Sequence, residues 1–200
     1  MSALRDPAEP HAGATSMPLL QRYLATAIDL HRQVKHASWN LREPDTVILG
    51  KSLGKVALAM EYCCELLVAH AVMHDGTVNG TVQLVAARSF LPRYRLGRAA
   101  AHLHGAAVIE AMEIFAASAR STATGAVERG DRDTAALLIE IARCTERQIW
   151  MIRAAMPPAQ PVPPPSPLAG EVSPDLLAPG EVDRYQIARN GAASSGGSRP

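Results

Sequence analysis

The chain has 200 residues and a formal net charge of +1, which suits one domain with tails. Hydrophobic residues make up 48% of the sequence and aromatic residues only 4%, and segments of alternating polarity are scarce, so the composition favours an all-helical fold. A chain this close to neutral has no strong electrostatic attraction for nucleic acid or for an anionic membrane.

The two ends of the chain are predicted to lie outside the folded core. Residues 1–15 are rich in Pro, Gly, Ala and charge, lack the apolar run of a signal peptide, and should form a flexible arm. Residues 157–200 are rich in Pro, Gly and Ser, and proline cannot continue a helix, so we expect a disordered tail. The folded domain is therefore expected to span residues 16–156.

The first half of this domain is predicted to be a helical hairpin. The first helix is expected to begin at Ser16, a good N-cap, and to end by Asn40, before a turn at Pro44. The second helix is expected to run from a cap at Asp45 to about His74. Its apolar residues alternate spacings of four and three, the pattern of a bundle seam: Leu49, Leu53, Val56, Met60, Cys63 and Leu67.

A long crossover and a second hairpin are predicted to follow. Residues 77–94 are too many for a hairpin loop and contain the apolar piece VQLVAA, which we expect to form a short helix. An Ala-rich third helix should run from near Arg95 to a stop at Gly130, and Asp131 or Asp133 should cap the fourth. Two hairpins joined by one long crossover describe an all-α, ferritin-like four-helix bundle.

Three segments carry a resemblance to a known family, and they occur in the family's order: QVKHASWNLREP at residues 33–44, HDGTVNGTV at 74–82 and GDRDTAALLIEIARCTERQIWMI at 130–152. The first matches the family signature at Trp39, Asn40 and Pro44. These segments resemble the Dps family, the mini-ferritins of starved cells, over about residues 17–155. The resemblance implies a cytoplasmic dodecameric cage for iron storage and DNA protection in the stress response, built from this chain alone or with an active paralogue.

The resemblance also implies an iron-oxidising centre between two subunits, and most of its ligands are missing here. The family's His before the Trp falls on Ser38, and its His-x-x-x-Asp pair falls on Gly50 and Gly54. Its Asp-x-x-x-Glu pair falls on Glu65 and Ala69. Only Glu65 keeps a side chain that suits iron. We therefore expect a degenerate ferroxidase centre, no catalytic residue, and a cage or co-assembling subunit that does not oxidise Fe(II).

The two glycines leave two interpretations open. Gly50 and Gly54 lie inside a predicted helix, where each glycine costs about 0.5–1 kcal/mol relative to alanine. They either reflect relaxed selection at a lost iron site, or make room for a partner helix or a ligand.

Two other functions stay open. His70 and His74 are one helical turn apart and, with Glu65, would offer a non-standard iron site for a storage protein that still binds ferric iron. The second open function is that of a nucleoid-associated structural protein, which would bind DNA through a local positive patch. Because neither terminal arm is basic, we expect DNA binding to be weak or absent otherwise. The patch consists of Arg88, Arg93, Arg95 and Arg98.

The cysteines and the hydropathy complete the expectations. Cys63, Cys64 and Cys144 show no zinc-binding spacing, so they are expected to be reduced thiols in a cytoplasm. No stretch approaches 18 uncharged apolar residues, so we expect no membrane span.

Overall fold

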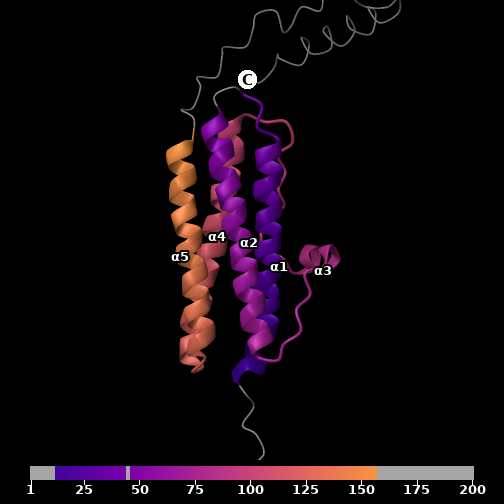
Figure 1. Cartoon of the computed structure of the whole chain (residues 1–200), viewed down its shortest axis with the longest axis vertical. Helices are drawn as coiled ribbons and strands as arrows, with labels where there is room; N and C mark the ends of the chain where they lie inside the picture. The colour runs from indigo at the N-terminus through magenta and orange to yellow at the C-terminus, as the bar shows by residue number, and fades with distance from the viewer. Residues whose placement is uncertain (1–11, 44–45, 157–200) are drawn as a thin grey trace, which may run out of the picture. The chain divides into compact units, whose positions relative to one another are not determined.

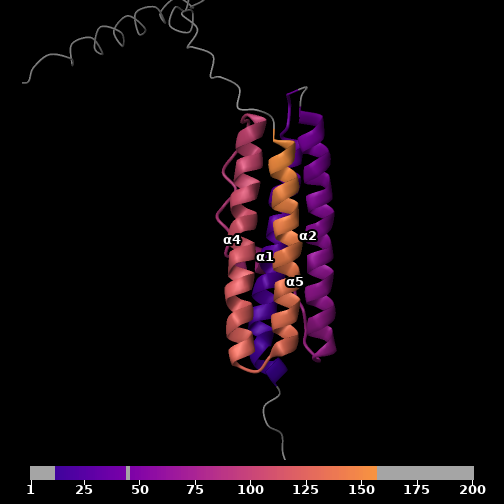
Figure 2. The ribbon, with the colours of Figure 1, turned by 90° about the vertical axis from the view of Figure 1, so that its left-hand side faces the viewer.

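The computed structural model describes residues 12–43 and 46–156, and in this part of the chain all regular structure is helical. The helices are α1 (Ala12–Trp39), α2 (Val47–Met73), α3 (Val82–Arg88), α4 (Ala101–Glu128) and α5 (Arg132–Ala155). α1 pairs with α2 and α4 pairs with α5, while α1 also packs on α4 and α2 on α5, which closes the bundle (Figures 1 and 2). The prediction of a ferritin-like four-helix bundle is confirmed. The expected Asp45 cap, Pro44 and nearly all of both expected tails lie outside the described residues.

The seam predicted for α2 is the centre of the core. Its six large side chains are all buried, which is what the alternation of four and three residues requires. α4 buries mostly alanines: Ala101, Ala111, Ala116, Ala119, Ala123 and Ala126. Small buried residues on this helix leave room for the large side chains of the others in a close-packed interior.

The crossover between α2 and α4 is held against α1 by side chains of that helix. The Gln21 amide donates to the carbonyl of Asn79 at 2.6 Å and accepts from its backbone N–H at 3.0 Å. Ser89 Oγ donates to Asp29 at 2.6 Å, and the Gln33 amide donates to the carbonyl of Pro92 at 3.1 Å. Figure 1 shows the short helix α3 outside the bundle, beside α1. The predicted crossover with a short helix is thus confirmed.

The third long helix begins later than predicted. It was expected near Arg95, but α4 begins at Ala101, and the backbone before it is extended at Ala100. Glu43, from the loop after α1, accepts a hydrogen bond from the Ala101 N–H at 3.3 Å. The helix start is therefore set by a capping carboxylate 58 positions earlier in the chain, which no local pattern reveals.

The first long helix begins earlier than predicted. α1 starts at Ala12, four residues before the expected cap at Ser16, so it takes in part of the expected arm. Ser16 is buried, and its hydroxyl donates to the Asp131 carboxylate instead of capping its own helix. Asp131 also accepts from the Thr134 N–H at 3.0 Å, and so caps α5. Of the two residues predicted to cap the fourth long helix, Asp131 and Asp133, Asp131 is the correct one.

α2 is long and apolar enough to cross a membrane by length and composition alone, which the sequence expectation did not anticipate. In this bundle, 39% of the residues in its most apolar window are buried. The seam packs on α1 and α5, so the core accounts for much of its apolar character. Other apolar residues of α2 are exposed on its solvent side, among them Ile48, Leu58 and Val72.

α2 and α4 end in the same backbone motif with different residues at its left-handed position. After α2, Asp75 has φ +56°, and the Asp75 and Gly76 N–H groups bond to the carbonyls of Val72 and Ala71 at 3.0 and 2.9 Å. After α4, Gly130 has φ +79°, with the equivalent pair of bonds. Both ends are Schellman motifs, but only Gly130 adopts the left-handed conformation without steric cost.

This difference predicts opposite effects of two matched substitutions. Gly130→Ala should destabilise the fold by about 1–2 kcal/mol, because an alanine Cβ meets no neighbour there and only backbone strain counts. Asp75→Gly should raise stability by up to about 1 kcal/mol by removing that strain. Chemical denaturation of both variants measures the two changes. Equal stability of Gly130→Ala and the unmodified chain would contradict the assignment of this motif.

Candidate functional site

The outer face of α2 carries an exposed stripe that includes the one retained ligand position. Val47, Leu58, Tyr62, Glu65, Ala69 and Met73 are all exposed, and their spacing places them on one side of the helix. Leu58 is 66% exposed. We call these six residues the outer face of α2. Exposed Lys51 and Lys55 interrupt the apolar residues of this side between Val47 and Leu58. The apolar residues from Leu58 to Met73, on the solvent side of a bundle helix, indicate contact with another protein surface.

The two halves of the implied iron centre lie far apart in one chain. Ser38 is half-buried near the end of α1, and Gly50 and Gly54 are half-buried in the first two turns of α2. Glu65 lies 11 residues beyond Gly54, which is about 16 Å along the helix at 1.5 Å per residue. A centre that used both halves would therefore need a second subunit, as the resemblance implies.

The two glycines of α2 have room for a side chain. A Cβ at Gly50 would meet only the Leu41 side chain, at an ordinary contact distance of 3.6 Å. A Cβ at Gly54 would have no neighbour within 4 Å. Among the described residues, therefore, no close packing requires either glycine. A partner helix or a ligand would be the source of any close approach at these positions.

His70 and His74 lie close together but face different surroundings. Their ring centroids are 4.7 Å apart. His70 is buried, with Nε2 3.1 Å from the Thr134 hydroxyl, whereas His74 is exposed. Burial, followed by the positive charge of His74 when protonated, lowers the pKa of His70, which keeps that imidazole neutral near pH 7. In the described part of the chain no three His, Cys, Asp or Glu side chains gather closely enough to hold a metal ion.

The signature residues of the first segment have local structural roles. Trp39 is 65% exposed, with the Lys35 ammonium 5.8 Å from its ring centroid. The Asn40 amide donates to the His36 carbonyl at 2.8 Å and ends α1. Trp39 is the last residue of α1, and a short loop separates it from the start of α2 at Val47.

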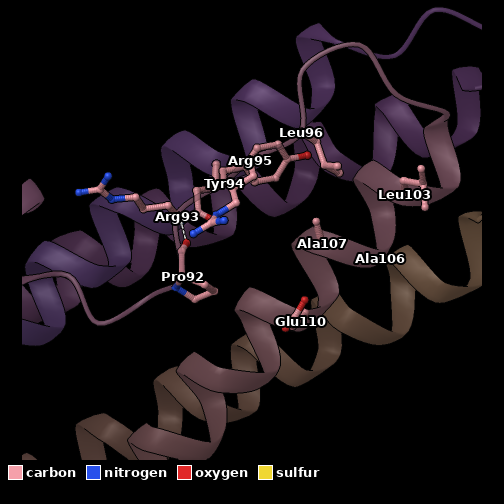
Figure 3. A pocket seen from close by; sticks show the side chains of 10 residues that line it. Pro92, Arg93, Tyr94, Arg95, Leu96, Leu103, Ala106, Ala107 and Glu110 are labelled. Atoms are coloured by element: carbon pink, nitrogen blue, oxygen red, sulfur yellow. Dashed lines mark hydrogen bonds between the residues drawn. The ribbon is translucent and has the colours of Figure 1, made fainter. Parts of the chain in front are cut away.

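The arginine patch borders a groove between the crossover and α4. Arg93 and Arg95 are exposed on the crossover wall of this cavity of about 420 Å³ (Figure 3). The α4 wall consists of Leu103, two alanines and Glu110, so a carboxylate faces the groove from the opposite side. The groove therefore lacks the uniform positive lining that phosphate contacts require.

A polar cluster at the edge of this groove, with His104 buried and Tyr94 half-buried, was missed by the sequence analysis. The Tyr94 hydroxyl and His104 Nδ1 are 2.7 Å apart, and the His36 ring packs edge-on to Tyr94. Burial raises the pKa of Tyr94 to about 12 and lowers the pKa of His104. Tyr94 lies in the irregular crossover, where no periodicity signals burial. We interpret the cluster as the polar link that holds the crossover to α4.

The sequence is similar to that of a known protein. No protein-family model matches the chain. The chain is 26% identical over 144 residues to a "DNA protection during starvation protein" of Agrobacterium fabrum, which covers 72% of this chain and 89% of that protein.

Solved structures agree on the fold. DpsC from Streptomyces coelicolor superposes with a TM-score of 0.70 at 22% identity, covering 80% of this chain and 94% of that one. An archaeal Dps homologue from Halobacterium salinarum gives 0.68 at 18% identity, covering 77% and 86%. The chain therefore has the fold of the Dps structures, and its sequence is similar to that of a Dps protein over 72% of its length.

Proposed function

We propose that this chain is a cage-forming Dps subunit that does not oxidise iron, acting in the cytoplasm as a homo-oligomer or together with an active paralogue. One observation carries the proposal. Four ligand positions of the family's centre hold side chains that do not suit iron, namely Ser38, Gly50, Gly54 and Ala69. Glycine and alanine offer no donor atom at all, whatever the surroundings.

Assembly of identical subunits does not restore the centre. In a homo-oligomer each intersubunit site repeats the same residues, so it would contain the Glu65 carboxylate and no imidazole from Ser38, Gly50 or Gly54. Iron sites need several ligands held by supporting hydrogen bonds. A paralogue with intact ligands would complete only its own half of each intersubunit centre. The chain's role in a mixed cage would then be structural.

The outer face of α2 supports an oligomer. Its apolar residues are exposed in one subunit, although helices of soluble monomers seldom present such a stripe to water. Closed symmetric assemblies cover surfaces of this kind with a second copy. Glu65 lies in the middle of this stripe, which agrees with a position at a subunit contact.

Two alternative functions have weaker support. A non-standard iron site at Glu65, His70 and His74 would need His70 to leave its buried contact with Thr134. A nucleoid-binding role would rest on the Arg88, Arg93, Arg95 and Arg98 patch, and two of these residues, Arg93 and Arg95, face Glu110 across the groove. The relative's name refers to DNA protection. For this chain we propose that the cage itself protects DNA, without binding through the terminal arms, because these arms carry no excess of positive charge.

The first prediction concerns assembly. The purified full-length chain should form a closed oligomer, with a dodecamer of 21.3 kDa subunits as the expected species. Leu58→Glu should shift it to smaller species, because it buries a charge at the subunit contact. Val127→Glu, at an exposed apolar residue of α4, is the matched control and should leave the mass unchanged. Multi-angle light scattering measures all three, and a monomer at micromolar concentration would overturn the proposal.

The second prediction concerns iron. Oxidation of Fe(II) by peroxide should be no faster with the chain than without it, because no complete ligand set exists. Restoring the family residues together (Ser38→His, Gly50→His, Gly54→Asp, Glu65→Asp and Ala69→Glu) should introduce saturable oxidation. Stopped-flow absorbance of Fe(III) follows the reaction. Saturable oxidation by the unmodified chain that disappears in Glu65→Ala or His70→Ala would contradict the proposal.

The third prediction separates the two explanations of the glycines. Gly50→Ala and Gly54→Ala should each raise stability by about 0.5–1 kcal/mol, because the added methyl groups have room and the unfolded chain loses freedom. If a partner helix packs closely there, the double variant should instead lose about 1–3 kcal/mol by overpacking. Thermal unfolding and oligomer mass together distinguish the outcomes. A stabilised variant with unchanged mass indicates relaxed selection, and a dissociated one indicates a repurposed contact.

A further inference from the structure

A cavity of about 470 Å³ lies between the N-terminal half of α1 and the end of α3, the short helix beside it in Figure 1. Side chains from both sides line the cavity: Pro18, Arg22, Ala87, Arg88, Ser89 and Phe90. Both arginines are exposed, so solutes reach their guanidinium groups. None of these described lining residues carries a carboxylate, in contrast to the groove that Glu110 borders.

The Arg22 side chain is held in place by an aromatic ring. Its Cζ atom lies 5.1 Å from the centroid of the Phe90 ring. Phe90 itself packs edge-on to Tyr23, with ring centroids 5.6 Å apart, and is stacked with Phe115 at 6.3 Å. Both of those rings are buried in the core. A guanidinium group stacked on a ring keeps the N–H groups at its edge available, and its fixed position lowers the entropy cost of binding a ligand.

The positive charge of the cavity is not compensated by the described part of the chain. The ion pairs found in residues 12–43 and 46–156 lie between α4 and α5 and include neither Arg22 nor Arg88. Asp29 is close to the cavity, but its two oxygens accept hydrogen bonds from Ser89 Oγ at 2.6 Å and from the Gln33 amide at 3.3 Å. The Ser89 hydroxyl is therefore also occupied. The polar side chains left for a ligand are the two guanidinium groups, which attract an anion.

We propose that this cavity binds a small organic phosphate, with the phosphoryl group between Arg22 and Arg88. Guanidinium groups pair with phosphate oxygens through two parallel N–H···O bonds. The two arginines belong to different helices, α1 and α3, and so approach the cavity from separate walls. A tetrahedral phosphate group offers oxygens to both walls at once, whereas the two oxygens of a planar carboxylate point to one side. This difference favours a phosphate over a carboxylate.

The size and the remaining lining favour an organic phosphate with a single phosphoryl group. A volume of about 470 Å³ is in the range of small-molecule sites. Pro18, Ala87 and the half-buried Phe90 ring offer apolar surface to the organic part of the ligand. Nucleic acid is bound instead through many phosphate contacts along a surface, and this cavity has two guanidinium groups. The proposal does not depend on the proposed loss of iron oxidation.

Isothermal titration calorimetry of the full-length protein with phenyl phosphate tests the site, in a buffer free of phosphate and at constant ionic strength. We expect one saturable site per chain. Arg22→Gln and Arg88→Gln should each weaken binding by about tenfold or more, because each removes a charge-assisted pair of hydrogen bonds. Arg22→Lys keeps the charge but lacks the planar fork, and it should weaken binding as well. Arg93→Gln removes the same charge from an exposed crossover residue outside the cavity, and it is the matched control that should bind like the unmodified chain.

Three other probes test the class of ligand. Inorganic phosphate and benzoate should both bind more weakly than phenyl phosphate, and a DNA duplex should not depend on Arg22. Absence of saturable binding, equal affinity for benzoate or inorganic phosphate, or an equal loss in Arg93→Gln would each overturn the proposal. A duplex that binds through Arg22 and Arg88 when phenyl phosphate does not bind would also overturn it, in favour of a nucleic-acid surface. Because the two arginines are exposed and lie on different helices, a folding defect in one variant leaves the other as the test.

Discussion

The seam of α2 is the constraint on which the rest of the structure depends. α2 packs both on its hairpin partner α1 and on α5 of the other hairpin, and this contact between hairpins is more extensive than that of α1 with α4. Its six buried seam residues therefore join the two halves of the bundle. At about 1.5–3 kcal/mol for each fully buried large apolar side chain, the seam contributes on the order of 10 kcal/mol before the entropy of folding is counted. No local motif of this chain contributes on that scale.

This magnitude explains how α2 tolerates a poor local sequence. Gly50 and Gly54 together cost the helix about 1–2 kcal/mol, and Asp75 adds the cost of a left-handed conformation at its end. Those costs are small beside the burial of the seam, so helix formation here is driven by packing. Glycine at positions 50 and 54 is therefore compatible with the fold, because the buried seam holds α2 in the bundle.

Sequence periodicity predicted the helices well but predicted their first residues poorly. The seam of α2 and the crossover followed from spacing and length. The starts of α1 and α4 did not, because Ser16 bonds to Asp131 and Glu43 caps Ala101, and both contacts join residues far apart in the chain. The candidate iron positions came from the resemblance alone. The Tyr94–His104 link lies in an irregular segment and carried no signal.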